Sequence, residues 1–170
     1  LVTIYVGLTI ITTFALKYSG MTWFDAVNHA MTSCGTCGFS TKNSSVAFWD
    51  SAVIEGIMMV AMTLSAIHFG VLYATLTGKR NNIFRSEVVR TFIIMMLVIS
   101  VVIAISLVAS DVYSNFGEAM RHASFQVVSI STTSGFATTD TNLWTPLAMV
   151  LLIFCSVICG CAGSTSGGMK

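Results

Sequence analysis

A run of 20 residues without a charged side chain, residues 91–110, constrains this chain more than any other feature. As an α-helix the run would extend about 30 Å, which matches the hydrocarbon core of a bilayer. Three further apolar runs cover residues 1–16, 51–77 and 145–160. Only 9% of the residues are charged, whereas a soluble domain carries about 25%. The sequence therefore predicts an all-α membrane protein.

Two shorter and more polar stretches, residues 22–34 and 115–131, lie between the apolar runs. Each has a composition that suits a helix, but each is too short and too polar to cross a bilayer. A loop rich in glycine and threonine follows each of them. Non-helical backbone is tolerated at membrane depth only where protein or a watery cavity satisfies its polar groups. We therefore interpret each stretch as a re-entrant pore helix followed by a pore loop, as in potassium channels.

The two halves of the chain align without gaps at an offset of 97 residues. The alignment places Thr36-Cys37-Gly38-Phe39-Ser40-Thr41 on Thr133-Ser134-Gly135-Phe136-Ala137-Thr138, and Ala26 on Ala123. Each half reads as membrane helix, pore helix, loop, membrane helix. This pattern predicts a tandem repeat of one helix–pore-loop–helix unit.

The connection between the two units is basic. Residues 79–90 carry four Lys or Arg side chains and one acid, so the positive-inside rule places this connection in the cytoplasm. The first unit then occupies residues 1–78 and the second, truncated unit residues 91–170, with both pore loops open to the outside. Three arginines are expected to anchor the cytoplasmic face: Arg80, Arg85 and Arg90.

The two aligned loops have the residue types that a cation pathway needs. Backbone carbonyl groups can replace the water shell of a cation, and glycine reaches the backbone angles that let successive carbonyls point the same way. A threonine hydroxyl adds another oxygen, and an aromatic ring can wedge the loop in place. The pore helices direct the partial negative charge of their C-terminal ends toward the cavity. The predicted filter residues are Thr36, Cys37, Gly38, Phe39, Thr133, Ser134, Gly135 and Phe136.

A second glycine-rich segment interrupts the last apolar run. It contains Gly160, Gly163, Ser164, Thr165, Ser166, Gly167 and Gly168. Each glycine costs a helix interior about 1 kcal/mol against alanine, so a plain helix is excluded here. A loose helix end at the cytoplasmic face is one alternative. A phosphate-binding loop is excluded, because Met169 separates the segment from Lys170 and an apolar helix precedes it instead of a strand.

These motifs resemble TrkH-type subunits of the Trk/Ktr/HKT superfamily of potassium transporters. The two T-x-G-F loops resemble degenerate filters that keep only the first glycine of the potassium-channel loop T-V-G-Y-G. The segment "GCAGSTSGGMK" resembles the broken helix of the third repeat in these subunits. The segments "FQVVSISTTSGFATTD" and "CGFSTKNSS" also resemble the sequences of these subunits. The resemblance covers essentially the whole chain.

The resemblance implies potassium uptake through a pore of four such repeats, of which this chain would hold the second and most of the third. It implies potassium at the filter carbonyls, a gate at residues 160–168, no transition metal, no cofactor and no enzymatic activity. It further implies a multi-pass protein of the bacterial inner membrane, in contact with lipid, that forms a homodimer and meets a cytosolic nucleotide-binding subunit of the TrkA type. Relatives with serine at the filter glycine tend toward sodium, so Gly38 and Gly135 favour potassium.

Because the chain begins inside an apolar run and ends just after a glycine cluster, we expect it to be a piece of a longer protein. The net charge of +1 gives no reason to expect a nucleic-acid partner. Three alternatives stay open for its function. These are a sodium-permeable or cation-coupled relative, a membrane thiol oxidoreductase that uses Cys34 and Cys37, and a structural membrane scaffold.

The five cysteines divide into two groups. Cys34 and Cys37 form a C-x-x-C motif, but no second pair with zinc-like spacing follows, so we expect them to be small pore-region residues. The other three lie in or just after an apolar run, where a cysteine packs as a small hydrophobe: Cys155, Cys159 and Cys161.

The histidines have less specific signals. His68 lies within an apolar run, where a functional role and a packing role are both open. His29 and His122 lie on or beside the pore helices and are expected to pack or cap instead of binding a metal.

Four of the acids on the side opposite the basic connection have expected roles. Asp25 and Glu118 lie near the starts of the pore helices, where a carboxylate complements the positive end of the helix dipole. Glu55 and Asp140 are expected to add negative potential at the outer mouth and to concentrate cations there.

Overall fold

The computed structural model describes residues 2–76 and 86–168, and all regular structure within these ranges is helical. Of the predicted cytoplasmic connection, Lys79, Arg80 and Arg85 lie outside the described residues, as do Met169 and Lys170. The predicted all-α class is confirmed. The helices are α1 (Val2–Tyr18), α2 (Trp23–Cys34), α3 (Ala52–Ala66), α4 (Phe69–Leu76), α5 (Glu87–Ala109), α6 (Phe116–Ser131) and α7 (Pro146–Ile158), with short 3-10 turns at Ser45–Phe48 and Thr141–Leu143.

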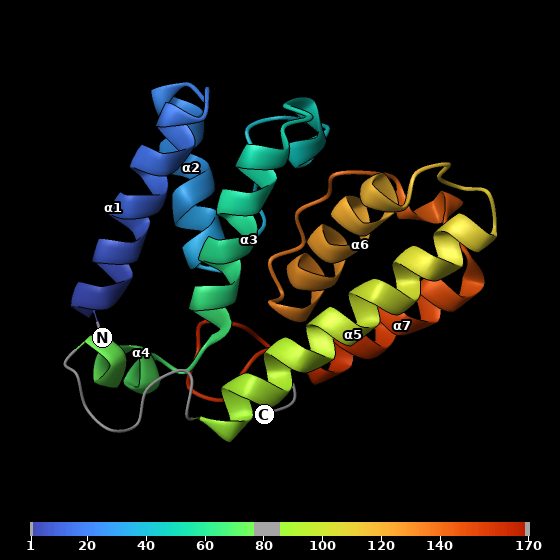
Figure 1. Ribbon diagram of the computed structural model, residues 1–170. Coiled ribbons are helices and arrows are strands. Elements are labelled where there is room, and N and C mark those ends of the chain that lie inside the picture. The colour runs from blue at the N-terminus through green and yellow to red at the C-terminus, as the bar shows by residue number, and fades with distance from the viewer. Residues whose placement is uncertain (1, 77–85, 169–170) are drawn as a thin grey trace.

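The helices form two groups with the same order of elements (Figure 1). Helices α1, α2 and α3 make the first group, and α5, α6 and α7 make the second. In each group a long helix is followed by a shorter one, a loop and a further helix. The short α4 lies below the first group, beside the start of α1.

Local capping chemistry explains where three helices begin. Thr22 accepts a hydrogen bond from the backbone of the first turn of α2, and Asn115 does the same for α6. Thr145 caps α7, whose first residue is Pro146, a position that suits proline because its missing N–H would have no partner there. Helices α2 and α6 begin within one residue of the starts predicted for the two shorter stretches.

The apolar run at residues 51–77 differs from the expectation of one long helix. It is divided into α3 and α4, whose axes are bent by 105° at the intervening Ile67 and His68. Ile67 has extended backbone angles, which end α3. Among the described residues, α5 alone is long and apolar enough to cross a bilayer by itself, and α3 and α4 meet that test only as a bent pair.

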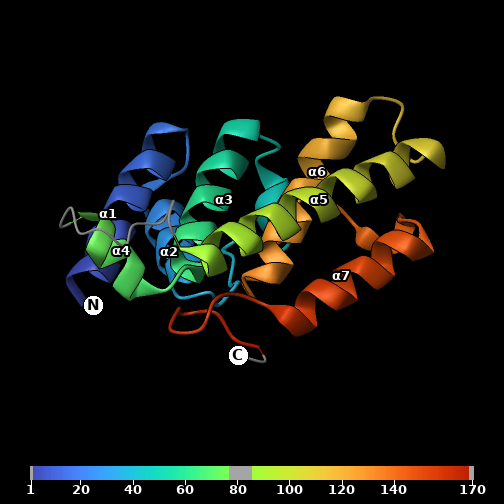
Figure 2. The same ribbon diagram turned by 60° about the horizontal axis from the view of Figure 1, so that its bottom comes forward.

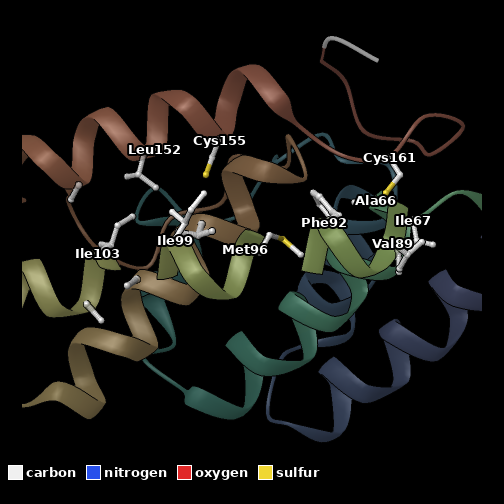
Figure 3. Close-up of a cluster of buried hydrophobic side chains, with 14 of the residues drawn as sticks. Ala66, Ile67, Val89, Phe92, Met96, Ile99, Ile103, Leu152, Cys155 and Cys161 are labelled. Carbon is white, nitrogen blue, oxygen red and sulfur yellow. The ribbon is translucent and has the colours of Figure 1, made fainter. Parts of the chain in front are cut away.

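Two apolar clusters hold the groups together. The larger joins α5, α6 and α7 to the break between α3 and α4 (Figure 3). In that view Ile99 of α5 lies toward Leu152 and Cys155 of α7, while Cys161 lies near Ala66. Cys155, Cys159 and Cys161 are buried, as predicted for small hydrophobes.

The second cluster crosses the boundary between the groups. It combines residues of α1, α2 and α3 with Phe125 of α6 and Phe136 of the following loop. Both phenylalanine rings are fully buried. Burial of large aromatic side chains is a dominant source of packing free energy, so this cluster fixes the loop after α6 against the first group.

Candidate functional site

The loops after α2 and α6, residues 35–41 and 132–138, share an unusual backbone. We call them the first loop and the second loop. Thr36 and Thr133 have φ values of 51° and 57°, and Gly38 and Gly135 have φ values of 71° and 76°. Positive φ is uncommon for a residue with a Cβ atom. Its recurrence at equivalent positions two residues apart turns the peptide planes in the same way in both loops, which is the kind of backbone a carbonyl filter requires.

Each loop is held to the C-terminal end of its own pore helix. In the first loop the Cys37 amide donates to the Thr32 carbonyl oxygen at 2.9 Å, and the Thr32 hydroxyl donates to the Phe39 carbonyl oxygen at 3.0 Å. Thr32 thus fixes the loop on both sides of the glycine.

The second loop repeats both bonds at the offset of 97 residues. The Ser134 amide donates to the Ser129 carbonyl oxygen at 2.9 Å, and the Ser129 hydroxyl donates to the Phe136 carbonyl oxygen at 2.7 Å. The repeat seen in the sequence therefore extends to individual hydrogen bonds.

The two loops lie against each other. A Cβ atom at Gly38 would overlap the carbonyl oxygen of Ser134, so this position requires glycine for space as well as for φ. At the equivalent Gly135, a Cβ atom would meet nothing within 4 Å. The loops are therefore neighbours at Gly38, and the described residues leave open space beside Gly135.

The aromatic residues of the two loops differ in their exposure. Phe136 is 1% exposed and lies against the first group, where its ring stacks on His29 at a centroid distance of 5.8 Å. Phe39 is 75% exposed. The second loop thus has a neighbour behind its aromatic ring, and the first loop has none among the described residues.

Behind the first loop, Asp25 and His29 on α2 bind the residues that follow Phe39. Asp25 accepts hydrogen bonds from the hydroxyls of Thr41 and Thr22, and Lys42 lies 3.9 Å away. The bond from Thr41, against the opposing effect of burial, lowers the pKa of Asp25. Asp25 lies in the first turn of α2, as the dipole argument predicts. Its bond to the end of the loop was not predicted.

His29 is fully buried and packs, as expected. Its Nδ1 lies 2.8 Å from the Asp25 carbonyl oxygen, which requires the hydrogen on Nδ1, and Nε2 accepts from the Ser40 hydroxyl at 2.9 Å. Burial lowers the pKa of His29, so the neutral ring is favoured. Within residues 2–76 and 86–168, no group of three His, Cys, Asp or Glu side chains could hold a metal ion.

Behind the second loop the same positions carry other side chains. His122 stands at the position of Asp25, and its Nδ1 lies 3.2 Å from the hydroxyl of Thr138, the counterpart of Thr41. Gln126 stands at the position of His29 and donates to the carbonyl oxygen of Thr139 at 3.4 Å. The loops are thus supported from equivalent positions by different chemistry.

The glycine-rich segment at residues 160–168 lies directly beside both loops. It runs from the end of α7 back beneath the first group (Figure 2). The Thr36 hydroxyl donates to the Thr165 carbonyl oxygen at 3.0 Å, and the Gly167 amide donates to the Thr133 hydroxyl oxygen at 2.8 Å. The structure therefore brings the predicted filter threonines and the predicted gate residues together.

The glycine-rich segment is hydrogen-bonded to the break between α3 and α4. The end of α3 leaves the carbonyl groups of Ser65 and Ala66 without partners in the helix. The Thr165 amide donates to the Ser65 oxygen at 3.3 Å, and the Cys161 amide donates to the Ala66 oxygen at 3.0 Å. The broken helix and the glycine-rich segment thus satisfy each other's backbone groups, as broken backbone at membrane depth requires.

His68 lies at the break with its ring over Gly163. A Cβ atom at Gly163 would overlap that ring, and the Phe69 amide donates to the Gly163 carbonyl oxygen at 3.4 Å. His68 Nδ1 accepts from the Gly70 amide at 2.9 Å. The sequence left a functional and a packing role open for His68, and the structure places it against the predicted gate.

Three further observations correct or refine the sequence analysis. Glu55 does not line an open mouth: its side chain is 1% exposed and bound by Arg121 of α6. Arg121 was missed as a site residue, although a lone acid in an apolar run signals a buried partner. Asp140 is exposed and caps the 3-10 turn that follows it. Cys34 is buried and Cys37 is exposed, and neither forms a disulfide.

Comparisons with known proteins agree with this geometry. The family described as "TrkH: Cation transport protein" matches residues 1–170. The Trk system potassium uptake protein TrkH of Escherichia coli (strain K12) is 37% identical over 169 residues, which cover 98% of this chain and 35% of the relative. TrkH of Vibrio parahaemolyticus is 38% identical over 170 residues, with the same coverage. The chain thus spans about a third of the length of these curated relatives. The crystal structure of the potassium transporter TrkH from Vibrio parahaemolyticus matches with a TM-score of 0.93 at 37% identity, covering 99% of this chain and 36% of that one.

Proposed function

The chain belongs to the TrkH family of cation transport proteins, a family of membrane-embedded transporters and not of enzymes, and from this membership we propose that it forms part of a potassium-conducting pore. The relatives named above are potassium uptake proteins by name. In this proposal the first and second loops are filters, with potassium bound at their backbone carbonyls.

The observation that carries the proposal is the contact between two loops of the same backbone. Gly38 lies against the Ser134 carbonyl, and each loop has positive φ at its threonine and its glycine. A cation that crosses a low-dielectric slab needs oxygen ligands in place of water, and adjacent loops of this kind can supply them. A structural scaffold would not need the same strained backbone twice.

The open edges of the two loops support a pore that continues beyond this chain. Phe39 is exposed where Phe136 is covered, and Gly135 faces open space where Gly38 faces a carbonyl. Further loops of the same kind would cover both edges. Because the chain spans about a third of its relatives, the rest of a longer polypeptide is the natural source of these loops.

We also propose that residues 160–168 form the gate. Hydrogen bonds join this segment to Thr36 and Thr133, the first residue of each T-x-G-F motif, which supports a gate beside the filters. Its glycines give it the backbone freedom to move. Movement away from the loops would open the path for ions.

The remaining parts of the proposal follow from the family. The protein is multi-pass in the bacterial inner membrane, in contact with lipid, forms a homodimer and meets a cytosolic nucleotide-binding subunit of the TrkA type. No cofactor takes part. A membrane potential contributes about 2.3 kcal/mol per charge per 100 mV, which can drive potassium inward without ATP hydrolysis in this subunit.

The test is the potassium-to-sodium permeability ratio of the full-length protein in vesicles. Gly135→Ser should lower this ratio, because serine strains the positive φ and adds a hydroxyl beside the carbonyls. Gly56→Ser on α3 is the matched control, since a Cβ atom there meets nothing within 4 Å. An unchanged ratio in Gly135→Ser would remove the filter assignment.

The same assay separates the alternatives. A sodium-permeable relative would show a low ratio before any substitution. A thiol oxidoreductase would lose its function in Cys34→Ala. A pore should keep its flux, because the buried Cys34 side chain does not line an ion path.

A further inference from the structure

Arg121 connects the two groups of helices through two carboxylates. Its Nε donates to Glu55 Oε2 at 2.8 Å, and its Nη2 donates to Glu55 Oε1 at 2.8 Å and to Asp50 Oδ1 at 3.0 Å. Glu55 and Asp50 belong to the first group, whereas Arg121 is on the pore helix of the second. Paired hydrogen bonds to one carboxylate fix both the distance and the direction of a guanidinium.

Burial makes this pairing stringent. The Glu55 side chain is 1% exposed and that of Arg121 is 29% exposed. A buried carboxylate that loses its partner is left with an uncompensated charge, which is strongly unfavourable. Helices α3 and α6 are therefore held in one relative placement.

The chain just before α3 also touches the second loop. We call residues 45–50 the clasp segment. The Ala137 amide donates to the Ser45 hydroxyl oxygen at 3.2 Å, and the Ala47 amide donates to the Ala137 carbonyl oxygen at 3.2 Å. Val46 between them is buried in the same apolar cluster as Phe136. The clasp segment thus binds the residue that directly follows the T-x-G-F motif.

The ends of the clasp segment have strained backbone. Ser45 has a φ of 54° and Asp50 a φ of 39°, and neither is glycine. Such conformations persist only where surrounding contacts hold them. At Ser45 the contact is with the second loop, and at Asp50 it is with Arg121.

The residues of the ion pair are not repeated at the equivalent positions of the two units. At the offset of 97 residues the counterpart of Arg121 is Phe24, and the counterpart of Glu55 is Leu152. The repeat architecture by itself therefore does not account for the ion pair.

From these contacts we infer that Arg121 is a positioning residue for ion selection. By binding Glu55 and Asp50 it holds the clasp segment against Ala137, and so it sets the spacing between the first and second loops. The inference rests on the proposed function, because spacing affects selectivity only if the two loops are filters.

The test uses full-length protein in vesicles, with the potassium-to-sodium permeability ratio, the total flux and the thermal unfolding temperature measured for each variant. Arg121→Gln should lower the ratio severalfold. Arg121→Lys keeps the charge but not the two-pronged geometry, so its ratio should be intermediate. The exchange Glu55→Arg with Arg121→Glu should recover part of the loss. Glu118→Gln is the matched control, since it removes an exposed charge from the first turn of the same helix.

If Arg121→Gln fails to fold, Glu55→Gln is the replacement variant. Glutamine keeps the shape of the Glu55 side chain and one hydrogen-bond acceptor for Arg121, but it removes the charge. A fall in the ratio with the control unchanged supports the inference. If these variants unfold at lower temperature but keep the ratio of the unsubstituted protein, Arg121 is only structural and the inference is overturned. Gly135→Ser, measured in the same assay, distinguishes a failure of the inference about Arg121 from a failure of the filter assignment. If it changes the ratio while the Arg121 variants do not, the filter assignment stands without the inference, and if it has no effect, the proposed function fails first.

Discussion

The first and second loops repeat the same hydrogen bonds to their pore helices, yet the side chains behind them differ. Asp25 and His29 support the first loop, and His122 and Gln126 support the second. The backbone that would bind ions is thus kept while its surroundings vary. The comparison suggests that the carbonyl geometry is the shared requirement and that charge and protonation behind each loop are free to differ.

The largest expected effect is at the two loop glycines. Gly38→Ala and Gly135→Ala each place a Cβ atom at positive φ, which costs about 1–3 kcal/mol for a non-glycine residue. At Gly38 the Cβ atom would also overlap the Ser134 carbonyl oxygen. If a further loop covers Gly135 in the full-length protein, as proposed, both variants should lose most of their potassium flux. A much milder effect of Gly135→Ala would show that no loop covers it.

The second prediction concerns the contact between the proposed gate, residues 160–168, and His68 at the break between α3 and α4. Gly163→Ala should push the glycine-rich segment away from His68 and raise the resting flux severalfold in vesicles, because the added Cβ atom overlaps the ring. Adding His68→Ala to that variant should recover part of the original flux by making room, although positive φ at Gly163 remains unfavourable for alanine.

Shortening residues 160–168 is the companion measurement and should also raise the flux. A flux that stays the same or falls in both experiments would remove the gating role. His68→Ala alone is the control for a general effect of the histidine.

The helix break and the ion pair show what the sequence could not provide. Thr22, Asn115 and Thr145 mark the starts of three helices because capping is a local interaction. The break falls at Ile67 and His68 and not at the nearby Gly70, so the residue types alone do not mark its position. Its cause is the glycine-rich segment, about a hundred residues further along the chain, whose amides bind the carbonyls that the break exposes.

The loops themselves were predictable as a pair because the repeat places their motifs in register. What the alignment could not provide is how they are joined. The bond of Arg121 to Glu55 links residues 66 apart in the chain, and no sequence pattern distinguishes Arg121 from the other cations as the partner of Glu55. Side-chain pairing across the boundary between repeats is a tertiary property.

A smaller effect is expected on thermal stability, where Asp25 behind the first loop should contribute more than His122 behind the second. Asp25 accepts hydrogen bonds from two hydroxyls, whereas His122 has one such contact. Hydrogen bonds to charged groups contribute about 1.5–3 kcal/mol each and neutral ones about 0.5–1.5 kcal/mol. Asp25→Ala should therefore lower the thermal unfolding temperature more than His122→Ala. His122→Asp, which makes the second loop resemble the first, should retain an acceptor for Thr138 and be the mildest of the three. Equal losses in the two alanine variants would contradict the difference in support.

The smallest expected effect is a pH dependence confined to the first loop. Burial lowers the pKa of His29 below its ordinary value of 6.5, so the unfolded chain binds this proton more readily than the folded protein. The contribution of the neutral ring to the free energy of unfolding is therefore complete above pH 6.5 and is lost as the pH falls toward the lowered pKa. Protonation also removes the Nε2 acceptor for Ser40. His29→Gln installs the side chain that the second loop has at Gln126, and it should remove this part of the pH dependence. Gln126→Asn, which adds no titrating group, is the control, and a pH dependence that survives in His29→Gln would assign it to another residue.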